Sequence, residues 1–310
     1  MVNTPYKELS NSTSELRPFM QFLIFLAILF VALIIGNVIG AGIIWVLYGS
    51  KTFTAITALN TAAPNFLNAL WILQLAGTTL PILITPVFFA YVVIPNPAEY
   101  IRSNFTFPWL LLVLIFGIMF ISAPLIELLS NINQKMVLPP FLKWMRESED
   151  NAQKLTNVML QMNTIWDMIF DLLFVGLLTA IVEEFMFRGC QQTIFEKWTK
   201  NTHAAIWITA ILFSAFHMEF FGFLPRLFLG VLFGYFVAWS GSIWTSVWAH
   251  FINNGTDVVV TYLSQHKKIS INPDDQHVFN SKIYMLSFII ILFLFWIYRQ
   301  IALNKKLVQV

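Results

Sequence analysis

Three short polar motifs lie inside stretches that are otherwise apolar enough to span a membrane. They are Glu183-Glu184-x-x-x-Arg188, Phe213-x-x-x-His217 and His250-x-x-x-Asn254. An ionisable side chain in the middle of a bilayer costs roughly 2.5–3.5 kcal/mol on insertion scales. Carboxylates, imidazoles and amides are also the groups that activate water and stabilise an oxyanion. The motifs therefore indicate a hydrolytic site held within the membrane.

The first motif places two carboxylates and one guanidinium on a single helix. Each residue advances about 100° around a helix, so Glu184 and Arg188 share a face. An acid four residues before a base is the favourable order for an ion pair. Two interpretations remain open for Glu183. It is a free base beside a Glu184–Arg188 pair, or both acids pair with Arg188 and only stabilise the helix.

The second motif brings an imidazole to the end of a short apolar stretch. His217 shares a helix face with Phe213. A histidine in such a place is either a catalytic group or a hydrogen-bonded residue near the membrane surface. Glu219, two residues further on, points to another side of the helix, and we expect it at the membrane surface.

The third motif belongs to a polar stripe on one face of an otherwise apolar helix. Lipid offers no hydrogen-bond partners, so the stripe must face protein or a watery cavity. It lines either a seam of hydrogen bonds between helices or one wall of a reaction chamber. The stripe consists of Ser246, His250, Asn253, Asn254, Asp257 and Thr261.

Taken together, the three helices could divide the work of hydrolysis. Glu183 and His217 would activate a water molecule, and a positioned general base contributes about 10²–10⁴-fold. His250 and Asn254 would donate hydrogen bonds to an oxyanion, each worth roughly 10²–10³-fold. We expect Glu183 and the two imidazoles to line one cavity, with a water bridging Glu183 and His217.

The composition sets the class of protein that must position these residues. The 310 residues are 58% hydrophobic and only 11% charged, with a mean hydropathy of +0.72, whereas soluble domains carry about 25% charged residues. Apolar runs of about 20 residues recur along the chain, which predicts an all-α, polytopic transmembrane helix bundle. We predict about eight spans, near 19–47, 67–96, 108–130, 165–195, 204–219, 224–239, 243–263 and 282–302.

Charge and cysteine content exclude some classes. A net charge of +2 gives no support for a nucleic-acid partner. The single cysteine, Cys190, excludes an internal disulfide and a cysteine-based metal cage, and we expect it to be packed and inert. The apolar stretch after residue 17 is too long for the core of a signal peptide, so we expect it to be retained. The distribution of lysine and arginine leaves the membrane orientation open.

The chain divides into four regions: amino-terminal helices (1–130), a polar segment (131–164), a core with the three motifs (165–263), and a loop with a last helix (264–310). Within the polar segment, residues 141–162 predict an amphipathic helix at the membrane interface. Its apolar residues recur at steps of three and four, with an interruption at Glu149. The helix is either a connector or a lid that guides substrate to a buried site.

Two smaller features complete the organisation. Gly36-x-x-x-Gly40 and Gly230-x-x-x-Gly234 predict close contacts between helices. Ser264–Ser281, which contains Pro273, Asp274 and Asp275, is typical of a loop.

The three motifs, in this order, resemble the type II CAAX prenyl endopeptidase family, also called the CPBP or Abi family of intramembrane proteases. The resemblance covers about 165–260, and Arg226, Gly230, Gly234 and Gly241-Ser242-Ile243 resemble the family's segment before the third motif. It implies an all-helical intramembrane endopeptidase. By the same resemblance, Glu183 and His217 activate water and His250 and Asn254 stabilise the oxyanion. Supporting roles fall to Glu184, Arg188, Phe213 and Asp257.

The family has been described both as metal-dependent and as glutamate-type. The sequence contains no His-Glu-x-x-His zinc motif. Glu183, His217 and His250 could nonetheless supply three ligands to a catalytic zinc with an open fourth position. We favour the interpretation without a metal or other cofactor.

The resulting hypothesis is a multi-pass integral membrane protein of a bacterial-type plasma membrane that hydrolyses a peptide bond of a membrane-associated or lipidated peptide or protein. Its expected partners are that substrate and the lipid bilayer, and its oligomeric state stays open. Two other classes compete: a non-catalytic membrane immunity or scaffold protein, and a proton-coupled transporter. No inverted repeat and no matching pair of Pro- or Gly-broken helices is apparent, which argues against transport.

Overall fold

The computed structural model describes residues 16–269 and 278–304, and within them the chain is helical without any strand. The prediction of an all-α fold is therefore confirmed. The α-helices are α1 (Pro18–Thr57), α2 (Phe66–Gln74), α3 (Leu80–Val93), α4 (Pro97–Ile101), α5 (Leu110–Gln134), α6 (Lys143–Met159), α7 (Ile165–Asp171), α8 (Thr179–Glu184), α9 (Gln192–Thr199), α10 (Thr202–Phe216), α11 (Phe223–Ser240), α12 (Ile243–Gln265) and α13 (Ser281–Leu303). Three π-helical stretches, η1 (Leu75–Thr79), η3 (Leu172–Leu178) and η4 (Phe185–Gln191), and the 3₁₀ turn η2 (Pro140–Leu142) complete the described elements.

The predicted count of eight spans is not confirmed. Within the described residues, six helices are long and apolar enough to cross a membrane: Pro18–Thr57, Phe66–Val93, Leu110–Gln134, Ile165–Thr199, Phe223–Ser240 and Ser281–Leu303. Of the other two predicted spans, α10 is apolar but has only 15 residues. Helix α12 has 23 residues, but its polar stripe lowers its hydropathy. The two helices that fall short are therefore the ones that bring His217 and His250 to the bundle.

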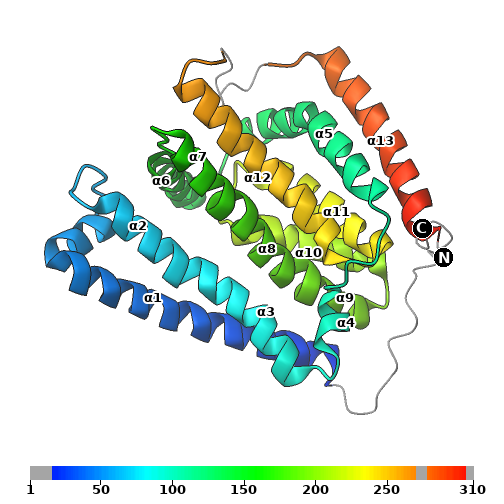
Figure 1. The fold of residues 1–310 in the computed structure, drawn as a ribbon, viewed down its shortest axis with the longest axis horizontal. Coiled ribbons are helices and arrows are strands. Elements are labelled where there is room, and N and C mark those ends of the chain that lie inside the picture. Colours follow the sequence, from blue (N-terminus) through cyan, green and yellow to red (C-terminus); the bar gives the residue numbers. More distant parts are fainter. Residues whose placement is uncertain (1–15, 270–277, 305–310) are drawn as a thin grey trace.

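The bundle is arranged around the segment that runs from α7 to α9. Helices α10, α11 and α12 pack on this segment, and α5 and α13 cover α11 and α12 from one flank (Figure 1). On the opposite flank, α1 and the continuous run from α2 to α3 form a long hairpin. The hairpin touches the rest of the molecule where α1 meets α9, where α3 meets η4 and α8, and where α2 meets α6. The helices of the three motifs thus lie in the middle of the molecule.

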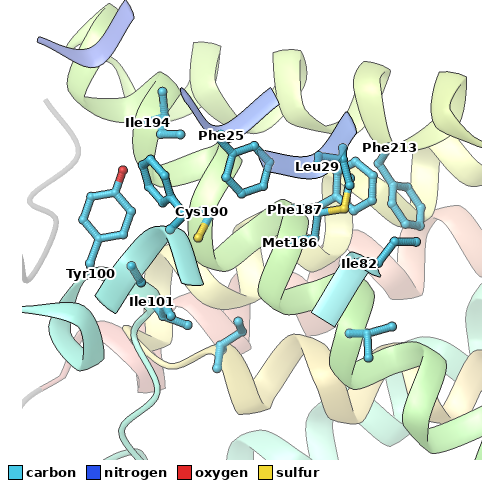
Figure 2. Packing of buried hydrophobic residues seen from close by; sticks show 14 of the residues in the cluster. Phe25, Leu29, Ile82, Tyr100, Ile101, Met186, Phe187, Cys190, Ile194 and Phe213 are labelled. Carbon is cyan, nitrogen blue, oxygen red and sulfur yellow. The ribbon is translucent and has the colours of Figure 1, made fainter. Parts of the chain in front are cut away.

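One apolar cluster joins the hairpin to the helix that carries the two glutamates. Phe25 and Leu29 of α1 meet Phe187 and Cys190 of η4, with Phe213 of α10 at one end of the cluster (Figure 2). The thiol of Cys190 is fully buried, and its Sγ atom lies 3.7 Å from the carbonyl oxygen of Pro86. The prediction that this cysteine is packed in the interior is confirmed.

Both pairs of small residues lie at close helix contacts. A Cβ atom added at Gly36 would stand 2.3 Å from the carbonyl oxygen of Ala76 in η1. One added at Gly230 would stand 3.0 Å from the Cβ atom of Ala210 in α10. The predicted close contacts are therefore present. Helix α1 is interrupted at Gly49, whose φ of 76° is outside the helical range, and this break lies two residues beyond the predicted end of the first span.

The polar segment forms the predicted amphipathic helix as α6, from Lys143 to Met159. Its last two turns pack with Leu155, Val158 and Met159 on an apolar cluster at the far end of the α1–α2 hairpin. None of the residues of α6 is buried. Helix α12 ends at Gln265 and α13 begins at Ser281, which agrees with the bounds of the predicted loop. Three residues of that loop, Pro273, Asp274 and Asp275, lie outside the described residues.

Candidate active site

The two glutamates of the first motif end α8, a short helix between two π-helical stretches. A π-helical turn is wider than an α-helical turn, and such turns occur frequently at functional sites. Arg188 lies within η4, and its Nη1 atom donates a hydrogen bond of 2.7 Å to Oε1 of Glu184. Both side chains are fully buried. The ion pair predicted from the four-residue spacing is therefore present.

Glu184 has a second partner that the sequence did not reveal. Nδ1 of His250, on α12, lies 2.8 Å from the same Oε1 atom of Glu184. On the other side, Nη2 of Arg188 donates to the carbonyl oxygen of Gly230 in α11, at 3.1 Å. These contacts form one continuous chain from Gly230 through Arg188 and Glu184 to His250, and we call it the buried polar chain. It links the imidazole of His250 on α12 to the continuous helix from α7 to α9 and to α11.

Aromatic rings fill the space around the buried polar chain. The ring of Phe213 lies nearly perpendicular to both imidazoles, with its centroid 5.2 Å from that of His217 and 5.9 Å from that of His250. The guanidinium of Arg188 lies 4.4 Å from the centre of the Phe213 ring. Phe233 stacks on His250 at 5.1 Å, with 25° between the ring planes. Phe213 thus contacts both imidazoles and the guanidinium of Arg188. The contact of Phe233 had no signal in the spacing of the motifs.

Glu183 lies between the two imidazoles. Its Oε2 atom is 3.9 Å from Nε2 of His217 and 3.9 Å from Nε2 of His250. This oxygen is buried and has no hydrogen-bond partner among the described residues. A distance of 3.9 Å is too long for a direct hydrogen bond, but a water oxygen about 2.8 Å from both atoms can bridge it. The three residues therefore meet at one place, as the sequence predicted.

The partners of the two Nδ1 atoms determine the tautomers. Nδ1 of His217 lies 2.9 Å from the carbonyl oxygen of Phe213, and a carbonyl can only accept, so Nδ1 carries the hydrogen. Nε2 of a neutral His217 is then an acceptor that faces Glu183. His250 also places hydrogen on Nδ1, because the Glu184 carboxylate accepts there. A second hydrogen, on Nε2, would make this nitrogen a donor that faces Oε2 of Glu183.

Asn254 lies one turn beyond His250 on the same face of α12. Its Nδ2 atom is 3.4 Å from the carbonyl oxygen of Val175 in η3, and its Oδ1 atom accepts a hydrogen bond of 3.2 Å from Asn253. The contact to Val175 is long for a hydrogen bond, so this amide is only loosely held.

The polar stripe of α12 extends from the interior toward one end of the helix. Ser246 is fully buried and His250 is nearly so. Asn253 and Asn254 are half-buried, and Asp257 is exposed. Seven residues along a helix correspond to about 10 Å. Asp257 therefore lies about two turns beyond His250 on α12, and its supporting role stays a prediction.

The arrangement of Glu183, His217 and His250 does not fit the zinc alternative. Bonds of about 2.0–2.1 Å to the two atoms 3.9 Å apart would enclose an angle of about 140–150°, far from the tetrahedral angle of a protein zinc site. Within the described ranges, no group of three or more His, Cys, Asp or Glu side chains has the spacing to hold a metal ion. The donor atoms would have to move inward before a metal could bind.

Comparison with known proteins supports the resemblance in the motifs. Residues 165–256 match the family model described as type II CAAX prenyl endopeptidase Rce1-like. The uncharacterized protein YpbD of Bacillus subtilis (strain 168) is 27% identical over 111 residues, which cover 34% of this chain and 52% of that protein. The match thus spans about half the length of this relative. No solved structure matches.

The matched segment contains all three motifs. The family is one of membrane proteases, which supports hydrolase activity, and with the six apolar helices it supports an integral membrane protein.

Proposed function

From the premise that residues 165–256 form a domain of the type II CAAX prenyl endopeptidase Rce1-like family, we propose that this protein is an intramembrane endopeptidase. Its substrate is a membrane-associated or lipidated peptide or protein, and its location is a bacterial-type plasma membrane. The reaction is hydrolysis of one peptide bond of that substrate.

A single observation carries the proposal: the buried Oε2 atom of Glu183 stands 3.9 Å from Nε2 of His217 and of His250 and has no partner among the described residues. An unpartnered buried carboxylate oxygen is costly. A water molecule between Glu183 and His217 would satisfy it, and that water is the nucleophile the reaction needs. A purely structural cluster would gain nothing from leaving this oxygen without a donor.

In the first step, the carboxylate of Glu183 takes a proton from the water while Nε2 of His217 accepts a hydrogen bond from it. The water oxygen attacks the carbonyl carbon of the scissile bond, and the carbonyl oxygen becomes an oxyanion. Nε2–H of a protonated His250 and the amide of Asn254 donate to that oxyanion. In the second step the C–N bond breaks, and the protonated Glu183 returns its proton to the leaving amine.

The buried polar chain has a defined part in this reaction. Glu184 accepts a hydrogen bond from Nδ1 of His250, so the imidazole is oriented with Nε2 toward the reaction site. Arg188 neutralises Glu184 and is itself anchored to Gly230. No step runs through a metal ion, because the three donor atoms are too far apart for tetrahedral coordination.

The test is cleavage of membrane peptides, with and without an attached prenyl chain, by the purified protein in lipid nanodiscs. Glu183→Gln keeps the size of the side chain but removes the base, and we expect it and His217→Ala to reduce cleavage by about 10²–10⁴-fold. Asp150→Asn, on the exposed side of α6, serves as the control and should cleave as the wild type does. Mass spectrometry of the products measures the rate and locates the scissile bond.

Two results would overturn the proposal. Equal cleavage by wild type and Glu183→Gln would remove Glu183 as the base. Intact peptides from every preparation, with all variants folded, would favour the non-catalytic or transporter alternatives. Metal analysis of the active protein completes the test. If stoichiometric zinc is lost together with activity, the mechanism without a metal is wrong, and the donor atoms must move closer together than they are in this structure.

A further inference from the structure

His217 stands at the junction of α10 and a tight loop. It follows the last residue of α10, and the next residue, Met218, has a φ of 55°. Gly222 is the N-cap residue that precedes α11. We call residues 217–222 the His217 loop. Because the imidazole is attached to the start of this loop, its distance from Glu183 depends on how the loop is held.

Two helices outside the motif region hold the His217 loop. Asn133, buried at the end of α5, donates a hydrogen bond of 2.8 Å to the carbonyl oxygen of Phe220 and accepts one of 2.6 Å from the backbone N–H of Leu224. From α6, Oε2 of Glu149 accepts a hydrogen bond of 2.9 Å from the backbone N–H of Phe221. The loop is therefore fixed by an amide on one side and a carboxylate on the other.

A second residue of α6 strengthens the same contact. The guanidinium carbon of Arg146 lies 3.5 Å from the centre of the Phe221 ring, a cation–π contact. Arg146 and Glu149 are three residues apart, so they share a face of α6. The Phe221 side chain is buried, with 4% of its surface exposed. These contacts explain why an acid interrupts the apolar stripe of α6 at position 149.

The other half of α6 rests on a different part of the molecule. Leu155, Val158 and Met159 pack on the end of the α1–α2 hairpin. Helix α6 therefore connects the α1–α2 hairpin to the His217 loop, although none of its own residues is buried. A helix held in this way can separate from the loop at the cost of few contacts.

The charges around Glu149 favour a contact that responds to pH. Burial and the nearby carboxylate of Glu219 raise the pKa of Glu149 above its usual 4.5, while the N–H of Phe221 and the guanidiniums of Arg226 and Arg146 act in the opposite direction. Arg226 is itself paired with Glu219. Because the pKa of Glu149 is raised in the packed state, its contribution to that state is fully present below its usual pKa of 4.5 and is lost as the pH rises through the raised pKa.

We propose that Glu149 is a positioning residue: through the backbone of Phe221 it holds the His217 loop, and with it the imidazole, at the working distance from Glu183. The packing of α6 on the bundle would thereby affect the activity of the site. This inference rests on the proposed function for its catalytic consequence, but the contact between α6 and the loop can be measured without any substrate.

The first measurement is backbone hydrogen exchange of residues 217–222 in nanodiscs. Glu149→Ala should speed the exchange of the Phe221 amide about 10-fold or more, because the hydrogen bond to the carboxyl group of Glu149 is lost. Glu149→Gln keeps an oxygen that can accept and should exchange more slowly than Glu149→Ala. Glu147→Gln, on the exposed side of α6, is the matched control. Exchange in Glu149→Ala equal to that in Glu147→Gln would overturn the proposal.

The second measurement separates positioning from general stability. Glu149→Ala should lower kcat about 10-fold with KM changed less than about 2-fold, because an imidazole that is misplaced affects the chemical step. Glu149→Gln should recover most of kcat. An unchanged kcat in Glu149→Ala, together with active wild type, contradicts the positioning role. Inactive wild type would instead count against the proposed function, and the exchange measurement would still decide whether Glu149 holds the loop.

Discussion

The two imidazoles of the site stand at the same distance from Glu183 but are held in different ways. His250 is nearly buried, its Nδ1 atom bonds to a fully buried carboxylate, and Phe233 stacks on its ring. His217 is 25% exposed, and its Nδ1 atom bonds only to a carbonyl oxygen of its own helix. One imidazole is thus fixed by the core of the bundle, and the other is placed by a loop near its surface.

This difference matches the tasks proposed for the two residues. An oxyanion donor works best when it is fixed before the charge develops, because no reorganisation is then needed. A group that receives the water must also let water and substrate enter. The fixed imidazole depends on the buried polar chain, whereas the exposed one depends on the His217 loop and α6. Substitutions on the two sides should therefore affect stability and activity in different proportions.

The largest effect on stability should come from the middle of the buried polar chain. Arg188→Ala leaves the carboxylate of Glu184 buried without its positive partner, and breaking a buried pair in this way costs about 3–5 kcal/mol. Thermal unfolding in detergent measures the loss. Lys282→Ala removes an exposed charge at the start of α13 and should unfold with the wild type. If Arg188→Ala has the same thermal midpoint as Lys282→Ala, the buried polar chain does not stabilise the fold.

The next largest effect on stability should come from one of the two imidazoles. We expect His217→Ala to lower activity by about 10²–10⁴-fold and His250→Ala, which removes an oxyanion donor, to lower it by about 10²–10³-fold. Only His250→Ala should also destabilise the fold, by about 1.5–3 kcal/mol, because it removes a hydrogen bond to a buried charged group. Unfolding and cleavage are measured on the same preparations. Equal loss of stability in the two variants would show that His217 is held as firmly as His250.

The far end of the buried polar chain should give the smallest effect. In Gly230→Ala the new methyl group would stand 3.1 Å from the Cα atom of Ala210, so the backbone of α10 or α11 must shift. Overpacking of this kind costs about 1–3 kcal/mol. Gly42→Ala is the matched control, since no heavy atom lies within 4 Å of its added Cβ, and alanine is the better helix former. A thermal midpoint of Gly230→Ala at or above that of Gly42→Ala would contradict the close contact.

Local patterns in the sequence were sufficient for the parts of the structure that depend on neighbouring residues. Apolar runs predicted the helices, and the four-residue spacing predicted the pair of Glu184 and Arg188. The small-residue pairs predicted close helix contacts. The count of eight spans was not confirmed, because α10 is short and the polar stripe makes α12 less apolar than a typical span.

Contacts between distant residues could not be predicted in the same way. The bond between Glu184 and His250 joins residues 66 positions apart, and nothing in either helix specifies it. The role of Glu149 as a partner of Phe221 left only an indirect signal, an acid in an otherwise apolar stripe. Exposure could not be predicted from helix periodicity either, since Asp257 shares a helix face with the nearly buried His250 but is itself exposed.

The two π-helical stretches on either side of Glu183 and Glu184 have a consequence for relating this chain to others. A wide turn accommodates one more residue than the α-helical path beside it. The helix face on which Glu183 and Glu184 lie is therefore shifted by one residue relative to the faces of the residues before Leu172 and after Gln191. A relative that lacked either wide turn would need a gap of one position in its alignment to keep its acids opposite the same neighbours, and an ungapped comparison would superpose the wrong face of the helix.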